Sequence, residues 1–195
     1  MKKASVIILA AGESSRMGMD KASLNLRNGK RFLDHLVEEY RAVGISDIFI
    51  IHQPRMDFEP YFSNQDIHLI PNHHIGRGRS WSIYLGLQQL KKGEATFIQN
   101  VDNPFTTRSL IAKMLKNAEP NRILIPQYKG KNAHPIYLPS SYISLIKKNG
   151  FEYYDFRTSI ESWPTKTIPW KHEEIRANIN TQKDYHKWIG LPTKD

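Results

Sequence analysis

Residues 9–21 read LAAGESSRMGMDK and directly follow the apolar run SVIIL at residues 5–9. The apolar run predicts a buried strand, and the small residues after it predict a loop with backbone N–H groups free to bind an anion. Arg16 and Lys21 add two positive charges to this loop. The stretch therefore predicts a phosphate-binding site at the end of the first strand.

The rest of the chain alternates apolar runs with segments of helical periodicity, which predicts an α/β fold with a mainly parallel, doubly wound sheet. Ligands of such sheets bind beyond the carboxyl ends of the strands, where the loop at 9–21 lies. We expect strands at 48–52, 67–70, 95–101, 122–126 and 133–138, a minor strand around residue 168 and an extended piece at 175–180. We expect helices at 31–43, 80–90, 107–117, 140–148, 154–163 and 181–188. Thr106 or Thr107 would cap the helix that ends at residue 117, and Thr181 would cap the last one.

Length and composition indicate one domain over residues 1–195, with 39% apolar and 24% charged residues. No run approaches the roughly 20 apolar residues of a membrane span, and no leader is expected before the first strand. The chain contains no cysteine, so a cytoplasmic protein is expected. The net charge of +9 favours anionic partners. Because the basic residues are scattered, a nucleic-acid surface ranks last among the hypotheses.

Three features at strand ends can share one cleft: the loop at 12–21, the loop at 72–82, and Asp102 after the strand at 95–101. A carboxylate that faces a phosphate loop is placed to hold Mg²⁺ against nucleotide phosphates. The alternative for Asp102 is a turn-forming role before Pro104.

The first loop is neither a Walker A motif, since no Gly-Lys-Ser/Thr follows its glycine, nor the dinucleotide fingerprint with three spaced glycines. Ala10, Ala11 and Gly12 would let a base and a triphosphate approach the backbone, while Arg16 and Lys21 would neutralise phosphate charge. A solvated loop with incidental charges is the competing interpretation.

The thirteen residues 9–21 resemble, without gaps, the signature of the molybdenum-cofactor cytidylyl- and guanylyltransferases, a family of nucleoside-triphosphate transferases. Further landmarks follow in the same order. Asn72 with GRSWSI at 78–83 resembles the second nucleotide loop, Asp102-Asn103-Pro104 the Asp-x-Pro metal site, and Ala133-His134-Pro135 a Gly-His-Pro element. Residues 155–157 and 178–185 resemble the acceptor-side and closing segments.

This resemblance implies a three-layer α/β/α, Rossmann-like fold of the nucleotide-diphospho-sugar-transferase type. It implies Mg²⁺-dependent transfer of a nucleoside monophosphate from an NTP onto a phosphorylated acceptor such as molybdopterin, with release of pyrophosphate. Arg16, Lys21 and Asp102 would be catalytic, Asp102 and Asn180 (or Asn178) would hold the metal, and His134, Asp155 and Arg157 would lie on the acceptor side. Nucleotide-binding residues would be Leu9, Ala10, Ala11, Gly12, Asn72, Gly78, Ser80 and Ser82.

The loop reads LAAG rather than LAGG, and Ser80 and Ser82 lie in the second loop, two details that resemble the cytidylyl branch and favour CTP. The ending Asn-x-Asn-Thr at 178–181 is commoner on the guanylyl side, so guanylyl transfer is the alternative. The acceptor half departs from the family pattern at Ala133, at residues 182–183 and at 155–157. Another acceptor, or a non-catalytic protein that binds a nucleotide or a finished cofactor, therefore stays open, and the oligomeric state is not readable.

Overall fold

The computed structural model describes residues 4–12, 21–54 and 67–190. These residues form an eight-stranded sheet with the order β3-β2-β1-β4-β7-β5-β6, and β8 pairs with β5 outside this path. The strands are β1 (Ala4–Leu9), β2 (Ile48–His52), β3 (Ile67–Pro71), β4 (Ala95–Asn100), β5 (Ile123–Tyr128), β6 (Lys131–Asn132), β7 (Ile136–Leu138) and β8 (Thr165–Pro169).

The sheet is mainly parallel, as predicted. β3, β2, β1 and β4 run parallel to one another, and β8 runs parallel to β5. β7 is antiparallel to both β4 and β5, and β6 forms a hairpin with the end of β5. The expected strand at 133–138 is therefore present only as the short β7.

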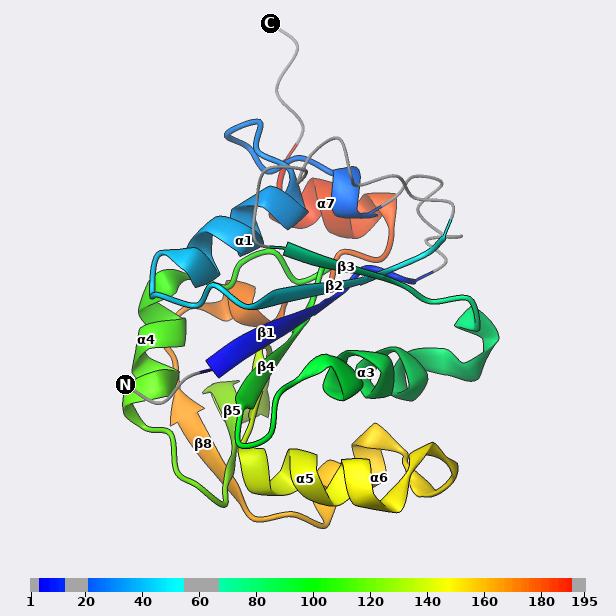
Figure 1. The fold of residues 1–195 in the computed structure, drawn as a ribbon. Helices are drawn as coiled ribbons and strands as arrows, with labels where there is room; N and C mark the ends of the chain where they lie inside the picture. The colour runs from blue at the N-terminus through cyan, green and yellow to red at the C-terminus, as the bar shows by residue number, and fades with distance from the viewer. Residues whose placement is uncertain (1–3, 13–20, 55–66, 191–195) are drawn as a thin grey trace, which may run out of the picture.

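Helices cover both faces of the sheet, which confirms the three-layer architecture (Figure 1). The α-helices are α1 (Phe32–Arg41), α3 (Gly78–Gln89), α4 (Arg108–Lys116), α5 (Ser140–Asn149), α6 (Phe156–Glu161) and α7 (Gln182–Trp188). Short 3-10 turns lie at η1 (Lys21–Ser23), η2 (Ile75–Arg77), η3 (Phe151–Tyr153) and η4 (Glu173–Arg176). In Figure 1, α1, α4 and α7 lie on one side of the central strands, and α3, α5 and α6 lie on the other.

The sheet separates two hydrophobic cores because alternate side chains of a strand point to opposite faces. In β1, Val6 and Ile8 belong to the core under α1 and α4, whereas Ile7 belongs to the core under α3 and α5. All three side chains are fully buried, so β1 is central to both cores.

Most elements lie where the sequence predicts them, and two expectations besides the strand at 133–138 need correction. The helix expected at 154–163 is shorter: α6 begins at Phe156, after the capping residue Asp155, and ends at Glu161. The 3-10 turn η3 precedes it at residues 151–153. The extended piece expected at 175–180 begins instead within the 3-10 turn η4. No helix among the described residues is long and apolar enough to cross a membrane.

Candidate nucleotide site

A cavity of about 420 Å³ opens at the carboxyl ends of β1 and β4, within the size range of small-ligand pockets. The backbone of β1 leads into it, since Ala10 N–H donates to the Ile51 carbonyl at 2.8 Å and Val101 N–H donates to the Leu9 carbonyl at 3.1 Å. The predicted residues that line the cavity are Leu9, Ala10, Ala11, Gly12, Lys21, Gly78, Ser82, Asp102 and Asn180. The sheet edge chosen from the sequence therefore carries a real pocket.

Lys21, Asp102 and Asn180 converge on one wall of this cavity. The Lys21 ammonium donates to Asp102 Oδ2 at 3.1 Å and to Asn180 Oδ1 at 2.5 Å. The Lys21 and Asp102 side chains are only 14% and 21% exposed, so this ion pair is shielded from water. Asp102 Oδ1 is buried without a hydrogen-bond partner among the described residues. One positive charge thus lies between the two predicted metal ligands, and one carboxylate oxygen has no partner in the described part of the chain.

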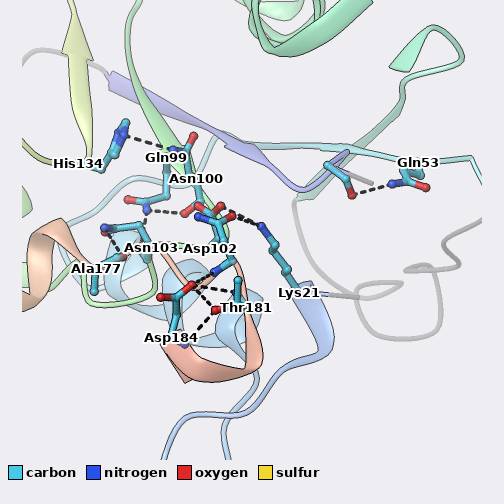
Figure 2. Close-up of polar contacts among 12 residues, drawn as sticks. Lys21, Gln53, Gln99, Asn100, Asp102, Asn103, His134, Ala177, Thr181 and Asp184 are labelled. Atoms are coloured by element: carbon cyan, nitrogen blue, oxygen red, sulfur yellow. Dashed lines mark hydrogen bonds and ion pairs between the residues drawn. The ribbon is translucent and has the colours of Figure 1, made fainter. Parts of the chain in front are cut away.

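Main-chain bonds bring Asp102 and Asn180 together although they lie far apart in the sequence. The Asp102 carbonyl accepts a hydrogen bond from Ile179 N–H at 2.7 Å. The fully buried Asn103 donates its side-chain N–H groups to the carbonyls of Ile175 and Ala177 at 2.8 and 2.7 Å. Figure 2 shows Asn103 facing Ala177 beside Asp102. The turn after β4 therefore holds the segment that carries Asn180.

A helix cap fixes the other end of that segment. Thr181 caps α7, and its hydroxyl and the Asp184 carboxylate form a reciprocal capping box. The Asp184 carboxylate also accepts from Asn180 N–H at 3.1 Å. A hydrogen bond from the Thr181 hydroxyl, and then those from the backbone N–H groups of Asn180 and Thr181, hold the pKa of Asp184 below its usual value. The cap predicted at Thr181 thus also orients Asn180 (Figure 2).

Two buried glutamines that the sequence interpretation missed support the site. Gln53 donates its amide N–H to the carbonyls of Gly12 and Ala11, at 2.7 and 3.3 Å, and so fixes the start of the first loop (Figure 2). Gln99 donates to the carbonyls of Asn100 and Asn103, which shapes the turn before and after Asp102. Each glutamine lies in or just after a buried apolar run, and a polar residue there is the sequence signal that could have identified it.

Asn72 and Ser80, two predicted nucleotide ligands, do not line the cavity and instead hold its walls. Asn72 is fully buried, and its amide donates to the hydroxyl of Ser82, which does line the cavity. The Ser80 hydroxyl accepts from Phe156 N–H at 3.1 Å and donates to Asp155 at 3.3 Å. These bonds fasten α3 to the beginning of α6.

A second cavity of about 330 Å³ adjoins the first, and Arg79 lines both. Its walls carry the predicted acceptor-side residues His134 and Arg157, and also Arg176 and Asn178. Asp155 does not line it, because its carboxylate caps α6. Hydrogen bonds from the Thr158 backbone and hydroxyl lower the pKa of the Asp155 carboxyl.

His134 is a partly buried, neutral group that lines the second cavity and contacts Asn100 of the first. Its Nε2 lies 3.2 Å from Asn100 Nδ2 (Figure 2), and its Nδ1 has no partner among the described residues. Burial, followed by the positive charge of Arg79, lowers the pKa of His134 to about 3. With Asn100 Nδ2 as the donor, the neutral imidazole carries its proton on Nδ1, which provides one unused N–H donor.

The described residues hold no group of three or more His, Asp or Glu side chains that could bind a metal ion by themselves. Asp102 and Asn180 are the predicted metal ligands on the wall of the first cavity, so a metal held by these two would take further ligands from a bound phosphate or water. Arg16, predicted to be catalytic, lies outside the described residues.

Known proteins share both the sequence pattern and the fold. A family model described as "MobA-like NTP transferase domain" matches residues 6–157. A probable molybdenum cofactor guanylyltransferase from Natranaerobius thermophilus is 33% identical, covering 95% of this chain and 96% of that protein.

Solved structures extend the comparison to the fold. A nucleotidyl transferase from Methanothermobacter thermautotroptrophicus superimposes with a TM-score of 0.77 at 17% identity, covering 97% of both chains. A molybdopterin-guanine dinucleotide biosynthesis protein A from Archaeoglobus fulgidus gives a TM-score of 0.68 at 20% identity, covering 95% of this chain and 96% of that one. The match at 6–157 spans most of the sequence, and the chain therefore belongs to the MobA-like NTP transferase family.

Proposed function

We propose that the protein transfers GMP from GTP onto the phosphate of a molybdopterin-type acceptor and releases pyrophosphate. The observation that carries this proposal is the convergence of Lys21, Asp102 and Asn180 on a cavity that adjoins a second, positively charged cavity. Transfer of a nucleotidyl group needs positioning and charge neutralisation more than it needs a covalent nucleophile. These two cavities offer both.

The first cavity suits the nucleoside triphosphate. Ala10, Ala11 and Gly12 place main chain rather than bulky side chains along it, which allows close approach by a base and ribose. The first turn of α3 borders the same space at Gly78 and Arg79 and contains no acidic residue. A helix N-terminus with that composition attracts phosphate.

Mg²⁺ fits the residues that are present. Asp102 Oδ1 is a buried carboxylate oxygen that no group in 4–12, 21–54 or 67–190 hydrogen-bonds, and Asn180 Oδ1 already contacts the ammonium of Lys21, so both oxygens are placed to bind a cation. A site with one carboxylate and one amide suits Mg²⁺, which usually keeps several waters and takes further ligands from phosphate. When bound, the ion would neutralise charge on the triphosphate.

The choice of GTP rests on the named relatives and on residues 178–181. Relatives described as molybdenum cofactor guanylyltransferases cover nearly the whole chain, and they do not support the CTP expected from the LAAG loop. The Asn-x-Asn-Thr ending, which resembles the guanylyl branch, is the segment that carries the metal-site residue Asn180. The Asn-x-Asn-Thr ending and the named relatives thus both favour GTP.

The second cavity suits an anionic acceptor. Arg79, Arg157 and Arg176 line it, and Glu161 is the one acidic residue in its described lining. Apolar side chains from β5, β7 and α6 complete its wall, and His134 Nδ1 offers a donor to a polar group. A phosphorylated molecule with a flat, partly apolar body matches this lining.

The proposal is tested by incubating the protein with each of the four NTPs, Mg²⁺ and molybdopterin, and measuring pyrophosphate release. We expect multiple turnovers with GTP and a rate at least about tenfold lower with CTP, ATP and UTP, a difference of ~1.4 kcal/mol in transition-state binding. Asp102→Asn should reduce kcat by about 10²-fold or more. Asp34→Asn, which changes the same charge on the distant helix α1, is the matched control.

Two results would contradict the proposal. Multiple turnovers with CTP alone would indicate that the protein transfers CMP. Tight binding of the finished dinucleotide cofactor, without pyrophosphate release from any NTP, would indicate a binding protein instead of an enzyme.

A further inference from the structure

Arg79 extends from the first turn of α3 and lies at the boundary of the two cavities. It is the residue common to the described linings of both. On the first cavity its neighbours include Lys21 and Asp102, and on the second they include His134 and Arg157. A group that passes from a ligand in one cavity to a ligand in the other must therefore pass close to this side chain.

The guanidinium of Arg79 is also uncommitted. Other arginines are held in ion pairs, such as Arg108 with Glu39 and Arg31 with Asp34. Arg79 has no hydrogen-bonding or ion-pair partner within residues 4–12, 21–54 and 67–190, and its guanidinium carbon lies 5.3 Å from the ring centre of Phe156. This contact with an aromatic face leaves the N–H donors of the guanidinium plane available to a ligand.

The position of Arg79 is fixed by its surroundings. Ser80, the next residue, binds Phe156 N–H and the Asp155 carboxylate, so the turn that carries Arg79 is fastened to α6. Burial lowers the pKa of the Arg79 guanidinium while the charge of Asp102 acts to raise it, and an arginine in this setting stays cationic at neutral pH. A preorganised cation of this kind stabilises charge without reorganisation during reaction.

We propose that Arg79 is a further catalytic residue, whose guanidinium binds the phosphate oxygens that lie between the two cavities during transfer. The inference rests on the proposed nucleotidyl transfer. In that step an oxygen of the acceptor phosphate forms a bond to the α-phosphorus, and the bond from the α-phosphorus to the bridging α–β oxygen breaks. The electron pair of that bond leaves with pyrophosphate, and total charge is conserved without a proton transfer. Arg79 donates to the transferred and the attacking phosphates together, a bidentate role suited to its planar fork.

The test compares Arg79→Gln, Arg79→Lys and Arg79→Ala with a charge-matched control, Arg122→Gln. Arg122 is exposed, pairs with Glu119, and lines neither cavity. We expect Arg79→Gln to lower kcat by about 10²–10³-fold, as for loss of one transition-state donor, while the dissociation constant of GTP measured by calorimetry changes less than about fivefold. Arg79→Lys should retain an intermediate rate, and added guanidinium chloride at low millimolar concentration should partly restore turnover of Arg79→Ala.

These readouts separate chemistry from folding. Rescue by guanidinium and the retained affinity for GTP would not occur if the substitution only disturbed the fold. The inference is overturned if wild-type protein turns over and Arg79→Gln keeps at least about one third of its kcat, or if only GTP affinity falls. Failure of the wild-type protein to release pyrophosphate with any NTP would instead reject the proposed function itself.

Discussion

Gly86→Ala is a stringent test of how α3 is packed against the sheet. Gly86 faces Ile7 of β1, and a Cβ atom added at residue 86 would lie 2.6 Å from Ile7 Cγ2, 2.9 Å from Cδ1 and 3.1 Å from Cγ1. Ile7 is fully buried in a strand that pairs with β2 and β4 on its two sides, so it cannot move aside. The helix must shift instead, and that helix carries Gly78, Arg79 and Ser82 into the first cavity.

The expected loss of stability follows from two opposing effects. Overpacking of a buried contact costs up to about 3 kcal/mol, and the contacts below 3 Å place this site at the upper end of that range. Replacing glycine by alanine inside a helix gains about 1 kcal/mol. The net loss is about 2 kcal/mol, which corresponds to a fall in Tm of roughly 4–8 °C for a chain of this size.

The assay is denaturant unfolding of wild type, Gly86→Ala, Ile7→Ala and the double variant. Ile7→Ala removes all three contacted atoms and alone should cost about 2–5 kcal/mol. In the double variant the new methyl occupies the space left by Ile7, so the combined loss should be at least about 1 kcal/mol smaller than the sum. Gly76→Ala, where an added Cβ meets nothing within 4 Å, is the control. Unchanged or increased stability of Gly86→Ala would refute the packing argument.

Three further predictions concern ionisable side chains. Glu39→Gln weakens the ion pair with Arg108 and should cost about 1 kcal/mol near neutral pH. Burial acts to raise the pKa of Glu39, but the hydrogen bonds from Arg108 lower it by more, so the folded carboxyl has a pKa below 4.5. The loss of stability caused by Glu39→Gln, measured by urea unfolding, should therefore shrink as the pH drops below about 4.5. Between pH 7 and 5 the free energy of unfolding of the wild type should fall by about 2 kcal/mol relative to that of His134→Gln. The reason is that the unfolded imidazole (pKa 6.5) takes up a proton in this range, whereas the folded one (pKa about 3) stays neutral. The same pH dependence for both proteins in urea unfolding would contradict this. Lys21→Met removes the cation beside Asp102, so it should tighten Mg²⁺ binding measured by calorimetry without nucleotide, while turnover falls. Weaker Mg²⁺ binding would argue that the ion and the Lys21 ammonium do not compete for the same place.

The sequence predicted the sheet edge of the site because buried parallel strands end at one edge and polar residues follow them. Lys21 and Asp102 were assigned to the same cleft on this argument alone, and they are in contact. Local signals also located helix starts: Thr181 caps the last helix as expected, and Thr107, one of the two candidates, caps α4.

Contacts between distant segments could not be predicted in this way. The Asp-Asn-Pro turn indicates a bend, but nothing near Asn103 indicates that its amide binds carbonyls 72 and 74 residues later. The Asp-Phe-Arg segment was expected on the acceptor side as a whole, whereas Asp155 caps a helix and only its neighbours reach the second cavity. Pairing of β7 against both neighbours also escaped prediction, because an apolar run does not encode strand direction.

The segment at 175–180 is attached to the turn after β4 through its backbone, and this has a consequence for how the protein can evolve. Ile175, Ala177 and Ile179 are buried and supply the attaching main-chain groups. The alternate residues Arg176 and Asn178 face the second cavity. Substitution at these two positions could therefore redirect the protein to a new acceptor while Asn180, the proposed metal ligand, stays in register. Saturation libraries at both positions, screened for acceptor KM against GTP affinity, would measure how independent the two functions are.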